Sequence, residues 1–180
     1  MPGSLVFTAA TDADADRVVD LVQSAYRGDA SRQGWTTEAD LLDDERIDAA
    51  GVRGKVATPG STVLLVTRDD DGLVACCELV DRGDGTSYFG LFAVRPGLQA
   101  AGLGRQVLAE AEQRASREHG STTMEMTVLA PRTDLVAWYE RRGYTRTGET
   151  REFVFADEHP ELEFVVLRKS LWPQVSPPRR

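Results

Sequence analysis

Two kinds of hydrophobic pattern follow one another along the chain. In one, β-branched, aromatic and small apolar residues form short runs or alternate with polar residues, which is typical of strands; in the other, apolar residues recur every three or four positions, which is typical of amphipathic helices. The first pattern predicts strands at residues 5–10, 61–67, 73–80, 86–94, 122–129, 151–155 and 162–167. The second predicts helices at residues 12–26, 37–51, 104–119 and 131–142. This order indicates an α/β (α+β) domain in which about four helices cover a mostly antiparallel mixed sheet of about seven strands.

Local signals support several of these boundaries. Thr11 or Asp12 is placed to cap the first helix, and Thr37 begins a pattern that resembles a capping box before the second. The polar, glycine-containing stretches 70–72 and 83–85 separate three runs of β-branched and aromatic residues. Such stretches are typical of hairpin turns, so the three central strands are expected to be consecutive and antiparallel.

Length and composition indicate one domain with its own core. The chain has 180 residues, of which 41% are apolar, and we expect one domain over residues 1–172 and a disordered tail over residues 173–180. Cys76 and Cys77 are adjacent, so they are poorly placed to form a disulfide and cannot build a zinc site; we expect reduced core residues and no metal. Apolar stretches such as residues 63–66 are too short to cross a membrane, and no basic segment marks a signal peptide. A cytoplasmic protein without a membrane partner is therefore expected.

The net charge of −8 is unevenly distributed along the chain. It results from 21 Lys and Arg against 29 Asp and Glu, and residues 11–50 hold eleven acids but only four bases. Nucleic-acid affinity depends on cationic side chains that displace counterions, so this composition disfavours a nucleic-acid partner. The acidic stretch is either a solvated helix face with its caps or a surface that attracts a cation.

A glycine-containing loop between a strand and a helix has the character of an anion site. Val94 ends the strand, Gln99, Gly102 and Gly104 follow, and residues 95–105 contain two bases and no acid. Free N–H groups and the helix dipole favour an anion at a helix start, and glycine lets a ligand approach the main chain. A closely packed helix start would have the same glycines for structural reasons alone.

The wider pattern distinguishes these alternatives. A strand that ends in Val, then Arg-Pro, then Gln-x-x-Gly-x-Gly, resembles the acetyl-CoA-binding motif of GNAT-type N-acetyltransferases, and the resemblance extends from Leu5 to Leu167. It implies the GNAT fold and acetyl-CoA as cosubstrate. A dinucleotide-binding fold would need a third glycine and a position after the first strand. The cofactor-binding residues that the resemblance implies are Phe92, Ala93, Val94, Gln99, Ala100, Ala101, Gly102, Leu103, Gly104 and Arg105.

A second motif lies in the last predicted helix. Residues 135–144 look like the family's helix that ends in aromatic-Tyr-x-x-x-Gly-aromatic. In GNAT enzymes this tyrosine is the usual general acid that protonates the departing thiolate, which implies that role for Tyr139; the alternative is an aromatic ring that only packs under the helix. The family often has Asn seven residues earlier, where this chain has Arg132, and we assign that residue no role.

A general base is harder to place. In one branch of the family a glutamate on the fourth strand acts as base, but counting back from Val94 along alternate residues gives Tyr88 at that place. Glu78 on the preceding strand is the nearest alternative, either as a solvent-facing residue or as a functional carboxylate. A water relay would need no dedicated base. His119 and His159 are both expected at the surface.

The acceptor side is expected to involve the first two helices and their loop. The substrate-binding residues predicted there are Tyr26 and Trp35, together with Tyr88; alternatively Trp35 fills the core. Because the acidic helices would attract a cation, a small primary amine or an amino acid derivative is the predicted acceptor. A catalytically idle acyl-CoA-binding or regulatory domain remains the alternative function, and a homodimer is compatible with the sequence. A tRNA-modifying enzyme of the same family would need a basic surface.

Overall fold

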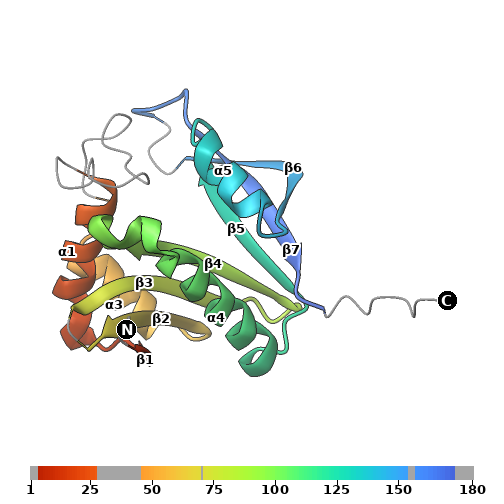
Figure 1. Cartoon of the computed structure of the whole chain (residues 1–180). Coiled ribbons are helices and arrows are strands. Elements are labelled where there is room, and N and C mark those ends of the chain that lie inside the picture. The colour runs from red at the N-terminus through yellow and green to blue at the C-terminus, as the bar shows by residue number, and fades with distance from the viewer. Residues whose placement is uncertain (1–3, 28–45, 70, 154–156, 173–180) are drawn as a thin grey trace.

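A mixed sheet forms the centre of the molecule. The computed structural model describes residues 4–27, 46–69, 71–153 and 157–172, without the side chains at positions 100 and 101. The strand order is β1-β2-β3-β4-β5-β7-β6, with β4 and β5 parallel and the other neighbours antiparallel (Figure 1). The strands are β1 (Leu5–Ala9), β2 (Ser61–Arg68), β3 (Gly72–Asp81), β4 (Thr86–Val94), β5 (Thr123–Leu129), β6 (Thr145–Glu152) and β7 (Glu163–Ser170). This mixed sheet confirms the predicted fold class.

Helices cover both faces of the sheet. The helical elements are η1 (Asp12–Asp14), α1 (Ala15–Tyr26), α3 (Ala49–Ala57), η2 (Pro96–Ala101), α4 (Leu103–Glu118) and α5 (Thr133–Glu140). Buried side chains of α1 and α3 form one core with β2, β3 and β4, whereas those of α4 and α5 form another on the opposite face. Figure 1 shows α4 on the opposite side of the sheet from α1 and α3.

The apolar stripe of each long helix produces its core. The stripe of α1 and the stripe of α4 are both buried against the sheet, and full burial of one Val or Leu side chain contributes roughly 1.5–3 kcal/mol. Cys76 belongs to the α1 core and Cys77 to the α4 core. Burial raises the pKa of the Cys76 thiol to about 12. Both cysteines are free and buried, as expected from their apolar surroundings.

Most of the second predicted helix, residues 37–51, lies outside the described residues, and only its expected end can be compared with the structure. The structure has α3 at Ala49–Ala57, which continues through Gly51 and Gly54, whereas residues 37–45, including Thr37, lie outside the described residues. Glycine is typical of a helix end, but here Asp48 is the N-cap, and its side chain accepts a hydrogen bond of 2.7 Å from the Gly51 amide. α3 therefore overlaps only the last three residues of the predicted helix and extends beyond its expected end at Gly51.

The sixth strand also differs from the prediction. It spans Thr145–Glu152 instead of residues 151–155, and residues 154–156 lie outside the described part. β6 is at the edge of the sheet and its side chains are mostly exposed. Its pairing with β7 shifts between Arg146 and Thr150, where Gly148 has a φ of 84°. An exposed edge strand with such an irregularity needs no apolar alternation, so the pattern could not reveal it.

A buried carboxylate ties the two halves of the sheet together. Glu125 is 1% exposed and accepts hydrogen bonds from Arg82, Arg151 and Arg168 at 2.6–2.8 Å. Arg82 follows β3, whereas Arg151 and Arg168 belong to β6 and β7. Glu125 pairs with Tyr88 in the short parallel ladder between β4 and β5. The network therefore reinforces the sheet where its main-chain pairing is shortest.

The environment of His119 differs from the expected position at the surface. It is half-buried, and its Nδ1 lies 2.8 Å from the Oγ of Ser87, which is fully buried. Ser87 also contacts Ser121 Oγ at 2.8 Å, so His119 joins a small polar cluster at the C-terminal end of α4. It is thus part of the structure beneath the β4–β5 ladder and not a solvated surface residue. His159 is also half-buried and lies 3.4 Å from Glu161.

Membrane-spanning helices and metal-ligand clusters are both absent from the described residues. Within the described ranges, no helix combines the length and apolar character needed to cross a membrane. In the same part of the chain, no three His, Cys, Asp or Glu side chains gather closely enough to hold a metal ion.

Candidate active site

The candidate site lies where β4 and β5 separate. Among the described residues, the two strands pair only over residues 86–88 and 123–125, after which β5 continues beside β7. Figure 1 shows the remainder of β4 diverging from β5. The main-chain groups of β4 beyond Tyr88 therefore face β5 without strand partners there. An edge of this kind can bind an extended ligand through main-chain hydrogen bonds.

A β-bulge interrupts β4 within this open part. Cys76 pairs with Ala93 and Glu78 with Gly90, so two residues of β4 oppose the single Cys77 between them. Leu91 has a φ of 45°, which is rare for a residue other than glycine. A bulge re-aims the side chains and main-chain groups that follow it. One such group, the Phe92 carbonyl, accepts a hydrogen bond from the Tyr26 hydroxyl at the end of α1.

The loop after β4 leads directly into α4. η2 ends at Gly102, whose φ of 76° is in the left-handed region that glycine adopts easily, and α4 starts at the next residue. The structure gives α4 no side-chain N-cap hydrogen bond and no acid in its first turn. Its first N–H groups are therefore available to an anion, and the helix dipole adds a favourable field.

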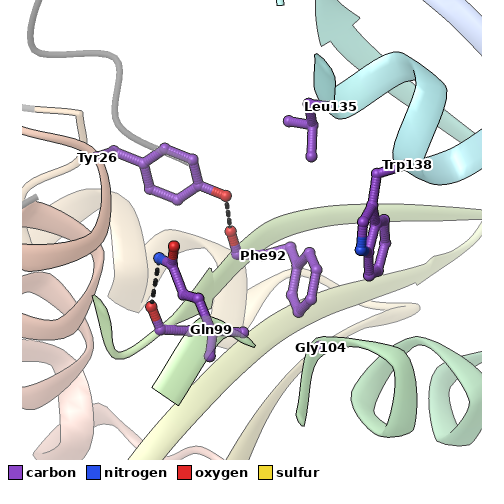
Figure 2. Close-up of a pocket in the computed structure, with 7 residues that line it drawn as sticks. Tyr26, Phe92, Gln99, Gly104, Leu135 and Trp138 are labelled. Atoms are coloured by element: carbon purple, nitrogen blue, oxygen red, sulfur yellow. Dashed lines mark hydrogen bonds between the residues drawn. The ribbon is translucent and has the colours of Figure 1, made fainter. Parts of the chain in front are cut away.

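An apolar cavity adjoins this helix start. We call it the Trp138 cavity; it is lined by Tyr26, Phe92, Val94, Gln99, Gly104, Leu135 and Trp138 (Figure 2). A Cβ atom on Gly104 would lie 3.4 Å from Phe92 Cζ and 3.6 Å from Trp138 Cζ2. The glycine therefore leaves room in the wall between the helix and the two rings. Figure 2 shows Gln99 pointing to the carbonyl of Val94, to which its Nε2 donates a hydrogen bond of 3.0 Å.

The structure brings together only part of the predicted cofactor residues. Four of them line the Trp138 cavity: Phe92, Val94, Gln99 and Gly104. The side chains of Ala93 and Leu103 instead lie in the α1 and α4 cores, so these residues present at most their main chain. Gly102 is the N-cap of α4, Arg105 is exposed in its first turn, and the side chains of Ala100 and Ala101 lie outside the described residues.

A second cavity of about 130 Å³ lies on the other side of Tyr26. We call it the Tyr139 cavity; its described lining is Tyr26, Arg46, Tyr88, Phe89, Gly90, Leu91, Phe92, Met126, Thr127, Val128, Leu129, Leu135, Tyr139 and Phe164. Tyr26, Phe92 and Leu135 line both cavities. The two cavities therefore meet at the bulge of β4, where a ligand on one side would adjoin a ligand on the other.

Tyr139 is placed to act as a proton donor in this cavity. Its side chain is 4% exposed, its ring stacks edge-on with Trp138 and Tyr144, and no hydrogen bond between described residues involves its hydroxyl. Burial raises the pKa of Tyr139 well above its ordinary value, Tyr26 acts in the same direction, and the positive charge of Arg46 opposes them. The phenol is therefore protonated at neutral pH and has its proton available for a ligand.

Glu78 is neither exposed nor part of the described cavity lining. It is 5% exposed, and its carboxylate accepts hydrogen bonds from Lys55 Nζ at 2.6 Å and Ser61 Oγ at 2.9 Å. The expectation of a solvent-facing residue is therefore wrong. A Cβ on Gly90 would lie 3.5 Å from Glu78 Oε2 and 2.8 Å from the Tyr88 ring. Because Gly90 lines the cavity, the carboxylate lies just behind a part of the wall that has no side chain.

The predicted acceptor residues are partly brought together. Tyr26 and Tyr88 both line the Tyr139 cavity, and the Tyr88 hydroxyl lies 2.9 Å from Thr127 Oγ1. Trp35 lies outside the described residues. The guanidinium of Arg46 lies 3.9 Å from the centre of the Tyr26 ring. Of the described lining residues, Arg46 alone carries a charge.

The acidic N-terminal stretch is only partly described. Its described members are Asp12, Asp14, Asp16, Asp20 and Asp48, and none of them lines the Tyr139 cavity. The other six acids lie between residues 28 and 45, outside the described part. The expectation that acids border the acceptor side therefore depends on residues about which the structure says nothing.

Sequence reasoning missed several contributors to the two cavities, including Arg46 and Thr127. It gave Trp138 and Leu135 no role beyond their place in the second motif, yet both line the Trp138 cavity. Thr127 on β5 holds the Tyr88 hydroxyl. Trp138 is the aromatic residue directly before Tyr139 in the second motif, and this place in the motif was its one signal in the sequence. Arg132 is buried at the N-cap of α5, 3.4 Å from Asp134.

Comparison with known proteins agrees with this geometry. Residues 27–158 match the family model described as an acetyltransferase (GNAT) domain. No curated protein sequence matches the chain significantly.

Solved structures extend the similarity to the fold. The ribosomal-protein-S18-alanine N-acetyltransferase from Escherichia coli is 12% identical with a TM-score of 0.69, over 98% of this chain and 99% of that one. A chimeric spermidine N-acetyltransferase from Vibrio cholerae and hSSAT is 13% identical with a TM-score of 0.70, over 93% and 95%. A candidate streptothricin acetyltransferase from Bacillus anthracis, in complex with acetyl coenzyme A, is 14% identical with a TM-score of 0.55, over 65% and 66%.

Proposed function

This chain belongs to the GNAT acetyltransferase family, and from that premise we propose that it transfers the acetyl group of acetyl-CoA by direct attack of a primary amine on the thioester. The acceptor is a small molecule or an amino acid derivative. The observation that carries this proposal is the protonated, unpartnered hydroxyl of Tyr139 in a cavity that adjoins an open strand edge and a free helix N-terminus.

The residues around the Trp138 cavity suit acetyl-CoA. The amides after Gly102 and the side chain of Arg105 would hold its diphosphate, and the free edge of β4 would bind its amide-containing arm beside Phe92 and Val94. The room left by Gly104 supports this assignment. When bound, acetyl-CoA supplies an activated acyl group as a thioester. The chain's task is to orient that group, stabilise developing charge and move protons.

Tyr139 would act as the general acid. The amine nitrogen forms a bond to the carbonyl carbon, the carbon–sulfur bond breaks with its electron pair on sulfur, and the Tyr139 hydroxyl donates its proton to that sulfur. A main-chain N–H of the bulged segment would stabilise charge on the carbonyl oxygen, because a donor fixed in advance needs no reorganisation. Proton transfer of this kind contributes roughly 10²–10⁴-fold to a rate.

Glu78 would receive the proton that the amine must lose. Hydrogen bonds from Lys55 and Ser61 fix the carboxyl oxygens of Glu78, and only Gly90 separates them from the Tyr139 cavity. Replacement by Gln at position 78 would then lower kcat. An unchanged kcat in Glu78→Gln would assign this step to water, with Tyr139 keeping its role.

An amine acceptor is supported by the structural relatives. Two of them carry their acceptor in their names, an alanine of ribosomal protein S18 and spermidine. The aromatic rings of Tyr26 and Tyr88 would face the acceptor in the Tyr139 cavity, with Trp35 as a further predicted contact.

A panel of acceptors tests the proposal. Release of the CoA thiol from acetyl-CoA would be measured with primary amines, amino acid derivatives, alcohols and simple anions as acceptors. Turnover confined to amines is the expected result. Turnover without a preference for amines would refute the acceptor class, and CoA binding without turnover of any acceptor would favour the idle-domain alternative.

A further inference from the structure

A group of three arginines adjoins the acceptor side of the site. Arg82, Arg151 and Arg168 all donate hydrogen bonds to Glu125, and we call these three residues the arginine cluster. The guanidinium carbon of Arg82 lies 5.0 Å from the centre of the Tyr88 ring, which lines the Tyr139 cavity. The cluster is therefore separated by one aromatic ring from the cavity in which the acceptor is expected.

Strand β5 connects the cluster and the cavity on one face of the sheet. Glu125 and Thr127 are two residues apart in the strand, so their side chains point to the same side. Met124 and Met126 alternate with them and belong to the α4 core on the opposite side. Thr127 lines the Tyr139 cavity, where it contacts the Tyr88 hydroxyl. A ligand in the cavity can therefore extend to the cluster without crossing the sheet.

The cluster carries more positive charge than its carboxylates neutralise. Its three arginines face two carboxylates, Glu125 and Glu149, and only Arg168 pairs with both. The side chains of Arg82 and Arg151 each donate one hydrogen bond, to the same oxygen of Glu125. Neither side chain has a further hydrogen bond or ion pair among the described residues. Since a guanidinium has five N–H donors, most of theirs are available to a ligand.

The two arginines are also accessible and held in place. The side chains of Arg82 and Arg151 are 32% and 39% exposed, although the Glu125 carboxylate between them is buried. A planar guanidinium that is fixed at one end and open at the other is well suited to bind a carboxylate through parallel hydrogen bonds. One surplus positive charge matches a ligand group with one negative charge, and the aromatic ring of Tyr88 lies directly beside it.

We propose that the acceptor is an amine that also carries a carboxylate, and that Arg82 and Arg151 bind this carboxylate beside Tyr88. The inference rests on the proposed function, because it narrows the acceptor class of the same cavity to amino acids with a free carboxylate. The amine enters the Tyr139 cavity while the carboxylate stays at the cluster, so selectivity comes from the end of the molecule that does not react. Arg82 and Arg151 are binding residues and take no part in the proton transfers.

Pairs of acceptors that differ only in the carboxylate test the proposal. The panel contains the standard α-amino acids and ω-amino acids of increasing length, each beside the amine that lacks its carboxylate. At saturating acetyl-CoA, thiol release should give at least one amino acid a kcat/KM roughly tenfold or more above that of its partner amine, as expected for charge-assisted hydrogen bonds. In the longer ω-amino acids the carboxylate hardly changes the pKa of the amine, so these pairs report the binding of the carboxylate.

Arg168→Gln is the matched control for the two binding residues. It also removes a hydrogen bond to Glu125, but its other donors already bind Glu149, so most of the preference should persist. Arg82→Gln and Arg151→Gln should each reduce the preference to about threefold or less. Arg82→Lys, which keeps the charge beside Glu125 but loses the planar fork, should retain the fold and part of the preference. The Kd of CoA should be unchanged in every variant, which checks that each has folded.

The possible contrary results separate this inference from the proposed function. Partner amines that react as well as or better than every amino acid would overturn the inference and leave the proposed function intact. A preference that falls no further in Arg82→Gln and Arg151→Gln than in Arg168→Gln would also overturn it, because arginines that only support Glu125 would act alike. Turnover of no amine at all would refute the proposed function as well.

Discussion

Replacement of Tyr139 by Phe removes a single oxygen atom from the Tyr139 cavity. The ring keeps its edge-on contacts with Trp138 and Tyr144, whose centres lie 5.0 Å and 5.8 Å away. The hydroxyl has no hydrogen-bond partner among the described residues, so its removal leaves no protein donor or acceptor unsatisfied there. The substitution therefore separates the chemical role of the hydroxyl from the packing of the ring.

The expected magnitude follows from these contacts. If the hydroxyl protonates the leaving sulfur, kcat should fall by roughly 10²–10⁴-fold, which corresponds to about 3–5 kcal/mol in the activation barrier. The free energy of unfolding should change by less than about 1 kcal/mol, because no hydrogen bond is lost. The Kd of CoA should remain within about twofold of the wild-type value, since a lost transition-state interaction does not alter ground-state binding.

The assay compares two tyrosines. Thiol release gives kcat, titration calorimetry gives the Kd of CoA, and urea unfolding gives stability for Tyr139→Phe and Tyr144→Phe. Tyr144 is the matched control, because it is 1% exposed and its hydroxyl donates a hydrogen bond of 2.9 Å to Glu112. Tyr144→Phe should lower the free energy of unfolding by about 1 kcal/mol and leave kcat nearly unchanged.

Two results would refute this reasoning. One is a kcat for Tyr139→Phe within about threefold of the wild type. The other concerns pH: because burial raises the pKa of Tyr139 above its ordinary 10.0, the phenol stays protonated across the neutral and mildly alkaline range. A fall of kcat between pH 7 and about pH 9 that disappears in Tyr139→Phe would show a phenol that ionises too early to be this acid.

Further predictions concern the cofactor wall and the sheet. Gly104→Ala would add a methyl group to the wall of the Trp138 cavity, in ordinary contact with Phe92 at 3.4 Å and Trp138 at 3.6 Å. Because this methyl group would occupy space that the cosubstrate needs, calorimetry should show roughly tenfold weaker binding of CoA. The melting temperature should stay constant or rise, because alanine favours a helix by about 1 kcal/mol over glycine. Glu125→Gln should lower the free energy of unfolding in urea by about 3 kcal/mol, since three arginines lose a buried carboxylate. Burial alone would raise the pKa of Glu125, but the hydrogen bonds from the arginines, that of Arg168 first, lower this pKa below 4.5. The stability that the ionised carboxylate provides above about pH 4.5 should therefore be lost as the pH falls further. This loss should be smaller in Glu125→Gln.

The parts of the fold that the sequence could predict are those with a strong local pattern. The apolar stripes of α1 and α4 and the two glycine-containing turns of the central strands all appear as expected. β6 was misplaced because an exposed edge strand needs no apolar face. The helix end expected at Gly51 is wrong because α3 starts at the Asp48 cap and continues through that glycine. In both cases the deciding interaction lies in pairing or capping, not in periodicity.

The site residues that could be predicted are likewise those that belong to a local sequence motif. The glycine loop and the aromatic-Tyr motif are local in the sequence, so Gln99, Gly104 and Tyr139 could be found there. The lining of the Tyr139 cavity could not, because it combines α1, β4, β5 and α5 from distant parts of the chain. Thr127 and Arg46 have no motif of their own; they belong to the site only through the fold.

The bulge in β4 explains why counting by alternate residues from Val94 failed. Such a count places Tyr88 on the face of β4 that carries Val94. In the structure, Phe89 shares the α4 core with Val94, whereas the Tyr88 ring lies beside Glu78 on the α3 side. One extra residue exchanges the faces of everything that precedes it.

The bulge assigns the two parts of β4 largely to different cavities. After the bulge, Val94 lines only the Trp138 cavity, before it Tyr88 and Gly90 line only the Tyr139 cavity, and Phe92 between them lines both. A regular strand would present all four residues on one face. Because Leu91 adopts a φ of 45°, one end of β4 can bind the cosubstrate while the other end faces the acceptor. The thioester would then lie at the bulge between them.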